Sequence, residues 1–225
     1  MPDSRTSDHG HPEPTYQHDT AFLRAAEIAV DLVRRPEVEQ QWLEPSALPR
    51  MAVGALACHL GRQVVHARNL LGQPTTEQPL SGARDHYRRA AWVTSTSLDD
   101  PANDRTSDER EAAAGFSVLS GIVTAALGDV RGMLRAGRAE PVVVIPWQGW
   151  ALRRDDFLLT RMLEMVIHGD DLAVSVGVHT PEFPDEVFAP VLELLGGLAV
   201  TRHGQSAVVR ALARAERAPR SIAAF

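Results

Sequence analysis

The sequence predicts a mainly α-helical protein: a four-helix bundle with additional C-terminal helices and at most a short β segment. Apolar residues recur three and four positions apart over several long segments, which is the period of an amphipathic helix. One run, Val142–Ile145, is instead rich in β-branched residues and lies between prolines. With 225 residues, of which 44% are hydrophobic, the chain can bury the core of one domain with a modest extension.

The N-terminal third is expected to hold a disordered tail and two helices. Residues 1–18 are rich in Pro, Asp, His and Ser and lack an apolar period, so they are not expected to pack. A first amphipathic helix is predicted over residues 20–35, because Pro36 cannot continue it. A second is predicted over residues 53–71, since Gly72 is a typical helix stop.

The middle of the chain is expected to be helical up to a short extended segment. A shorter helix is predicted over residues 83–94. A longer helical stretch over residues 102–137 carries the acidic sequence DRTSDERE near its start, where the helix dipole favours negative charge. Pro141–Arg153 reads as β or extended chain because of its branched side chains and prolines.

Three helices are predicted in the remainder. The first covers residues 156–176; Asp155 or Asp156 can cap its start, and Gly177 closes it. The other two cover residues 185–201 and 206–216.

Composition and charge exclude several classes of function. A net charge of −6 argues against a basic nucleic-acid surface and against a polybasic membrane anchor. No apolar run approaches the roughly 20 residues that span a bilayer. The polar, acidic N-terminus is unlike a secretory signal, so we expect a cytoplasmic protein without a nucleic-acid or membrane partner.

The cysteine and lysine content narrows the chemistry further. Cys58 is the single cysteine, which excludes an internal disulfide or an all-cysteine metal site. We interpret it as small core packing rather than as a ligand or nucleophile. All 23 residues counted as lysine or arginine are arginine, which excludes a lysine Schiff base and a P-loop lysine.

The most informative segment is RMLEMVIHGDDLAVSVG, residues 161–177. On a helix, its polar residues Arg161, Glu164, His168 and Asp171 lie along one face of an otherwise apolar segment. Glu164 and His168 are one turn apart and can bind the same ion, since zinc accepts both ligand types. The spacing also fits a polar stripe that faces solvent, in which Glu164 and His168 only contact each other. Taken alone, the spacing favours this interpretation over a metal site.

The predicted helix over residues 53–71 carries the other polar candidates. His59 lies among apolar residues in mid-helix; it is either a third ligand or a core or surface histidine with satisfied ring nitrogens. Arg62, one turn away, is a candidate to bind an anionic group. His66, two turns along the same face, is a candidate to support the site or to contact substrate at the rim of the bundle. With Glu164 and His168, His59 would complete a three-ligand set, and a catalytic zinc site typically has three protein ligands and one open position.

Two segments resemble the mycothiol-dependent maleylpyruvate isomerase family, which lies within the DinB-like (YfiT-like) superfamily of metal-binding helical bundles. WLEPSALPRMAVGALACHL, which starts at Trp42, is similar to the loop and helix that carry the first metal histidine of that family. R-x2-E-x3-H-x2-D-L-A, residues 161–173, is similar to the segment that carries the other two ligands. The resemblance covers roughly residues 21–177 and implies a zinc site on His59, Glu164 and His168.

The resemblance also implies a division of the chain. It assigns residues 19–177 to a DinB-like metal-binding bundle, after the tail over residues 1–18. Residues 178–225 then form a helical C-terminal extension, where the isomerases of the family carry an α/β domain. Met51 stands where the family usually has Trp.

The implied function is a zinc-dependent enzyme that activates a low-molecular-weight thiol, such as mycothiol as cosubstrate, for isomerisation or S-transfer. Asp171 would orient His168 or move a proton, and Arg161 and Arg62 would neutralise a carboxylate on a small-molecule substrate. A monomer or a homodimer fits this hypothesis. Two alternatives stay open: a thiol-independent metal-dependent hydrolase or lyase, and a non-catalytic helical module that binds a metal or ligand.

Overall fold

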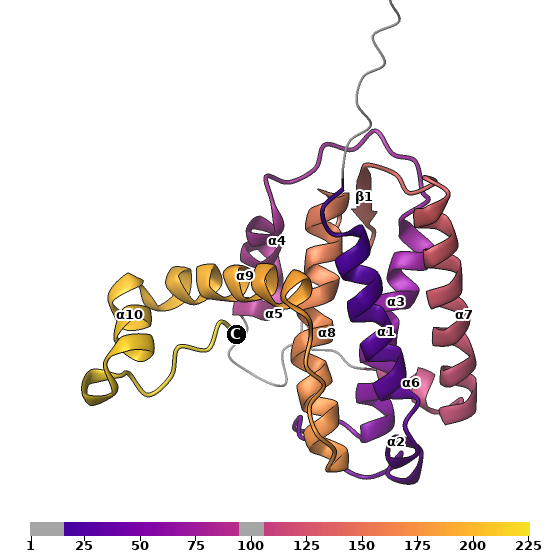
Figure 1. The fold of residues 1–225 in the computed structure, drawn as a ribbon, viewed down its shortest axis with the longest axis horizontal. Coiled ribbons are helices and arrows are strands. Elements are labelled where there is room, and N and C mark those ends of the chain that lie inside the picture. Colours follow the sequence, from indigo (N-terminus) through magenta and orange to yellow (C-terminus); the bar gives the residue numbers. More distant parts are fainter. Residues whose placement is uncertain (1–15, 95–105) are drawn as a thin grey trace, which may run out of the picture.

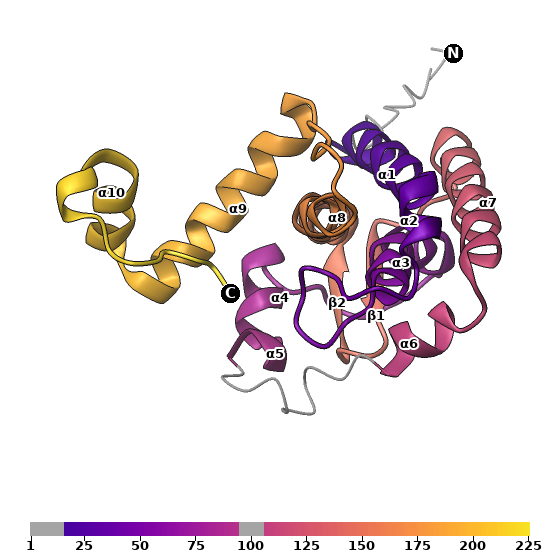
Figure 2. The same ribbon diagram turned by 90° about the horizontal axis from the view of Figure 1, so that it is seen from below.

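The computed structural model describes residues 16–94 and 106–225 and is mainly α-helical, as predicted. Four helices lie side by side and form the bundle (Figures 1 and 2). They are α1 (Asp19–Val33), α3 (Val53–Leu70), α7 (Phe116–Arg135) and α8 (Arg154–Val176). The mainly α-helical fold class is therefore confirmed.

The core of the bundle lies between the apolar faces of these helices. Phe22 of α1, Leu60 of α3 and Phe157 of α8 are among its fully buried side chains. The helices α3 and α7 approach closely at Gly61, where an added Cβ would lie only 2.6 Å from Cγ1 of Val123. Because a larger side chain would clash there, this close approach fixes the middle of α3, the part of the chain that carries His59.

The structure differs from the predicted helices in several details. The long helical stretch expected over residues 102–137 is divided into α6 (Thr106–Ala112) and α7, and residues 102–105 lie outside the described part of the chain. The division falls at Gly115, whose φ of 91° is incompatible with a right-handed helix. Pro36 does not only end a helix: it starts the short helix α2 (Pro36–Gln40), in the first-turn position that suits proline.

The region expected to be extended forms a two-stranded antiparallel hairpin. Strand β1 (Val142–Ile145) pairs with β2 (Trp150–Arg153). The strands lead directly into α8 and contact both α3 and α8. Next to them lie α4 (Ala83–Arg89) and α5 (Ala91–Thr94), which together replace the single helix predicted over residues 83–94.

The first aspartates of α8 do not cap that helix, in contrast to the prediction. Asp155 Oδ1 accepts a hydrogen bond from the backbone N–H of His18 (3.1 Å), at the start of α1. Asp156 Oδ1 accepts one from the backbone N–H of Ala83 (3.0 Å), at the start of α4. Each carboxylate therefore satisfies an unpaired N–H group at the start of another helix and joins that helix to α8.

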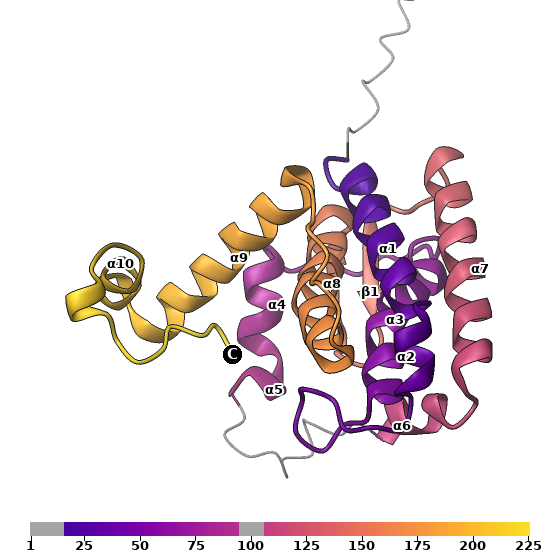
Figure 3. The same ribbon diagram turned by 60° about the horizontal axis from the view of Figure 1, so that its bottom comes forward.

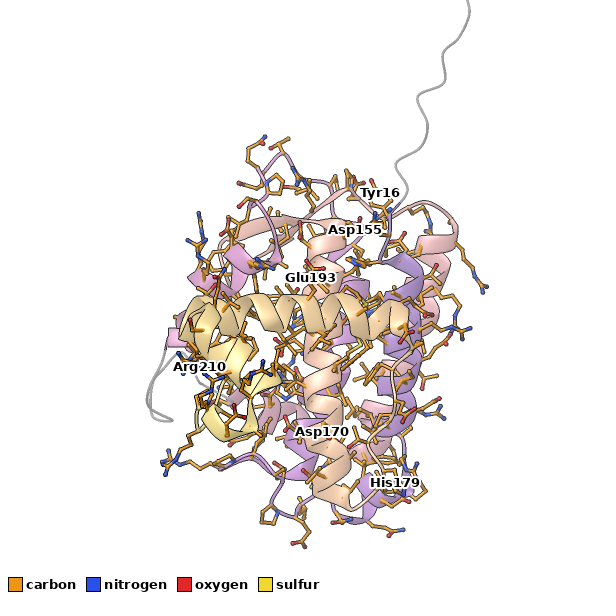
Figure 4. All side chains as sticks on the ribbon, turned by 60° about the vertical axis from the view of Figure 1, so that its left-hand side comes forward. Tyr16, Asp155, Asp170, His179, Glu193 and Arg210 are labelled. Carbon is orange, nitrogen blue, oxygen red and sulfur yellow. The ribbon has the colours of Figure 1, made fainter. Side chains whose placement is uncertain are left out.

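The C-terminal helices extend from one side of the bundle. The helix α9 (Asp185–His203) crosses α8 and contacts α1 and α4 (Figures 3 and 4). It is followed by α10 (Gln205–Ala213) and the 3₁₀ turn η2 (Ala215–Arg217), which point away from the bundle (Figure 1). These residues are helical, as expected, whereas the domain boundary at residue 177 stays a prediction.

The helix α7 differs from the expectation that no apolar run approaches the length that spans a bilayer. By length and composition it is long and apolar enough to cross a membrane, and among the described residues no other helix is. It packs against α3 and α1 in the bundle, and one helix of this kind is weak support for a membrane span.

The last residues of the predicted tail are in contact with the bundle. The imidazole Nδ1 of His18 lies 3.0 Å from the backbone oxygen of Asp155, and the guanidinium of Arg154 lies over the ring of Tyr16. Tyr16 and Asp155 are neighbours at one end of the molecule (Figure 4). The prediction of a disordered tail is therefore wrong for residues 16–18, and residues 1–15 lie outside the described part of the chain.

We expect two N-terminal deletions to differ in stability. Removal of residues 1–15 should leave the melting temperature unchanged, because their composition does not favour packing. Removal of residues 1–18 should also remove the contacts with Arg154 and Asp155, which contribute about 1–2 kcal/mol, or roughly 3–6 °C. Differential scanning calorimetry of both chains tests this. Equal melting temperatures would show that these contacts contribute nothing.

Candidate metal centre

Three of the predicted site residues come together inside the bundle. His59 projects from α3, and Glu164 and His168 project from α8. One ligand atom from each of the three lies within 4.8 Å of the others. Glu164 Oε2 is 3.7 Å from His59 Nε2 and 3.3 Å from His168 Nε2. The two imidazole rings meet edge to face with their centroids 4.6 Å apart.

Each of the three candidate ligands has two polar side-chain atoms. One faces the other two ligands, and the other contacts a neighbouring residue. His168 Nδ1 lies 2.9 Å from Asp171 Oδ2, and His59 Nδ1 lies 3.4 Å from Asp108 Oδ2. Glu164 Oε1 accepts a hydrogen bond from the hydroxyl of Tyr87 (3.3 Å). The two Nε2 atoms and Glu164 Oε2 are therefore left to face a common point, in the arrangement by which proteins orient metal ligands.

The donor set fits a zinc ion. His59 Nε2 is buried and has no hydrogen-bond partner, which is unfavourable for a polar atom unless a ligand occupies the position. Two imidazoles and a carboxylate are ligands that zinc accepts. Among the described residues, these are the three that could together hold a metal ion.

Electrostatics also favour a cation at this point. Burial raises the pKa of Glu164, but the close approach of the His168 and His59 imidazoles outweighs burial and keeps the pKa well below its usual range. Burial lowers the pKa of His168, but its hydrogen bonds with Asp171 and Glu164 raise it to about 9. Without a metal, the proton on His168 compensates the charge of these carboxylates, and an incoming metal ion would displace that proton.

The three candidate ligands border a cavity of about 360 Å³. Its wall combines aromatic rings with polar groups, among them Trp92, Trp147, His86 and Arg161. His66 also lines the cavity, where its ring stacks on Trp147 with centroids 4.2 Å apart. Burial lowers the pKa of His66 to about 3, so its imidazole is neutral near pH 7. A small molecule in this cavity would lie beside the three ligand atoms.

The structure gives Arg62 and Asp171 more specific positions than the sequence did. Arg62 lines the cavity, but its guanidinium already pairs with Asp108 (2.5 Å) and Glu111 (2.9 Å). It holds Asp108 in place, so it is not free to bind a substrate carboxylate.

Asp171 contacts Nδ1 of His168 and is not among the residues that line the cavity. This position fits orientation of His168 better than proton transfer to a substrate.

Cys58 is a core residue by position. It is 1% exposed, and burial raises the pKa of its thiol to about 12. A thiol in this environment is a poor nucleophile and a poor metal ligand at neutral pH.

Three residues of the site were not predicted from the sequence: Asp108, Tyr87 and His86. Asp108 belongs to the acidic segment that we interpreted only through the helix dipole; α6 packs it against α3 and leaves it 3% exposed. Tyr87 and His86 belong to the short helix α4 and are both buried. None of the three has a characteristic spacing to a ligand, so the sequence contained no local signal for them.

Comparison with known proteins identifies the family. The family model for the mycothiol maleylpyruvate isomerase N-terminal domain matches residues 22–173, about two thirds of the chain. The match includes all three candidate ligands and their neighbours Tyr87, Asp108 and Asp171. No curated protein and no solved structure matches the chain. The chain belongs to the mycothiol maleylpyruvate isomerase N-terminal domain family.

Proposed function

We propose that this chain is a zinc-dependent enzyme that activates a low-molecular-weight thiol, with mycothiol as cosubstrate, for isomerisation or S-transfer on a small molecule. The observation that carries the proposal is a three-residue donor set at the edge of a cavity of about 360 Å³. Three protein ligands leave a zinc coordination position open. The family match supports mycothiol as the thiol.

The roles of the residues follow from their contacts. Zinc bound by His59, Glu164 and His168 would hold a thiol sulfur as thiolate, the nucleophilic form. Asp108 and Asp171 each accept an N–H from the far side of an imidazole, which keeps Nε2 free for coordination. Tyr87 holds Oε1 of Glu164, which leaves Oε2 for the metal. The aromatic wall beside them would separate the thiol from bulk water.

Cobalt substitution tests thiol binding independently of turnover. In the Co²⁺-loaded protein, added mycothiol should produce a sulfur-to-cobalt charge-transfer band, because the sulfur occupies the open position. The band should not appear with a mycothiol derivative whose sulfur is alkylated, which is the matched control. We propose a cytoplasmic location, since a reduced thiol cosubstrate suits that compartment.

Two outcomes would contradict the proposal. Absence of the band with Co²⁺ bound would show that the thiol does not reach the metal. Turnover of a substrate by the zinc protein without any thiol would instead support metal-dependent hydrolysis, in which bound water is the nucleophile.

A further inference from the structure

The segment over residues 221–225 returns to the bundle and contacts the short helices beside the candidate metal centre. The chain leaves the bundle along α9 and α10, and these last residues come back to lie next to α4 (Figures 2 and 3). The ring centroid of Phe225 lies 5.4 Å from that of Tyr87 and 5.0 Å from that of Trp92. Tyr87 and Trp92 also meet edge to face, with centroids 6.0 Å apart, so the three rings form one aromatic cluster.

The end of α9 holds this segment by its backbone. Nε2 of His203 donates to the backbone oxygen of Ala223 (2.8 Å), and Nη1 of Arg202 donates to that of Ala224 (3.4 Å). The helix α9 itself packs on α4, where the guanidinium of Arg84 lies against Gly197. The segment is therefore joined to α4 twice, through α9 and through the ring of Phe225.

The aromatic cluster connects the segment with the candidate metal ligands. Tyr87 is fully buried, and its hydroxyl is the group that contacts Oε1 of Glu164 (3.3 Å). Trp92 lines the cavity, whereas Phe225 is not among the residues that line it. Phe225 therefore contacts, from outside the cavity, one side chain that orients a ligand and one that forms the wall. Packing around a buried ring decides where its hydroxyl lies, and so decides the geometry of the hydrogen bond to Glu164.

The family domain does not include this support. The match to the family model ends at residue 173, before α9, whereas Tyr87 and Trp92 lie inside the matched range. We propose that residues 221–225 are a strap that supports the metal centre from outside the family domain, with Phe225 as the positioning residue for Tyr87 and, through Tyr87, for Glu164. The inference rests on the zinc site of the proposed function, but not on its thiol or its reaction.

Competition with a chromophoric chelator measures the expected effect on zinc affinity. Phe225→Ala should weaken zinc binding by about threefold to tenfold, which is less than the loss of about tenfold or more expected for Tyr87→Phe, because the hydroxyl is loosened and not removed. In a Tyr87→Phe background, Phe225→Ala should weaken zinc binding no further, since the contact through which it acts is gone. Phe225→Tyr keeps the ring and should bind zinc as the unchanged protein does. Leu212→Ala is the matched control, because Leu212 belongs to the same C-terminal helices but is 78% exposed.

Hydrogen exchange of the zinc-free protein tests the strap without the metal. In Phe225→Ala, loss of the two ring contacts should make the backbone amides of α4 exchange about fivefold faster or more. Leu212→Ala should leave their exchange unchanged.

Several results would overturn the inference. Unchanged exchange of α4 in Phe225→Ala would show that the strap does not support this helix. Faster exchange with unchanged zinc affinity would show that the strap stabilises α4 without positioning Glu164. An equal loss of zinc affinity in the Tyr87→Phe background would show that Phe225 acts by another route. Absence of zinc binding in the unchanged protein would contradict the metal centre together with the positioning role, whereas failure of the cobalt experiment alone would leave both measurements unaffected.

Discussion

His59→Ala and His168→Ala are each expected to reduce bound zinc to well below one ion per chain. Either change leaves two protein ligands, too few for a stable site. Glu164→Gln should have a similar effect, because it keeps the shape of the side chain but removes the negative charge that offsets the dication. Elemental analysis of the purified, folded variants measures the effect.

The controls for this prediction lie on the same helix as His59. Cys58→Ser and His66→Ala should keep zinc, since neither side chain belongs to the group that faces the metal position. Full zinc occupancy in both histidine variants would mean that α3 and α8 do not form a shared site. Loss of zinc from folded Cys58→Ser would mean that the wrong residue of α3 has been assigned.

Asp108→Asn is expected to weaken zinc binding by about 10–100-fold. The carboxylate of Asp108 accepts from Nδ1 of His59 and pairs with the guanidinium of Arg62. Asparagine keeps an acceptor oxygen but removes the charge, which makes His59 a weaker ligand and leaves Arg62 with Glu111 alone. Asp171→Asn should act in the same direction through His168. Competition with a chromophoric zinc chelator measures both affinities.

Glu111→Gln is the matched control for Asp108→Asn. Glu111 is the other partner of Arg62, but its side chain is 51% exposed. Among the described residues, the carboxylate beside Nδ1 of His59 is that of Asp108 and not that of Glu111. Zinc affinity should change little in this variant. Equal zinc affinities for Asp108→Asn and Glu111→Gln would show that Asp108 acts only on Arg62 and does not orient His59.

Local sequence determined the helices and one half of the candidate site. Apolar residues that recur every three to four positions predicted the four bundle helices, because each helix buries an apolar face that its own sequence encodes. Glu164 and His168 needed no tertiary information, since one helical turn brings them together. The boundary at Gly115 was missed because a glycine within a helical pattern also fits a continuous helix, and only the backbone conformation distinguishes the two.

Only the tertiary structure decided which distant residues complete the site. Tyr87 and Glu164 are 77 positions apart, and His59 and Asp108 are 49 apart, so no periodicity relates them. Packing of α4 on α8 and of α6 on α3 brings them together. The same packing gives Arg62 two acidic partners, whereas Arg161 has none among the described residues, although the sequence presents both as arginines on metal-ligand helices. Charge compensation depends on distances in space, which is why the sequence predicted Asp171 beside His168 on the same helix but not Tyr87 and Asp108, which come from other helices.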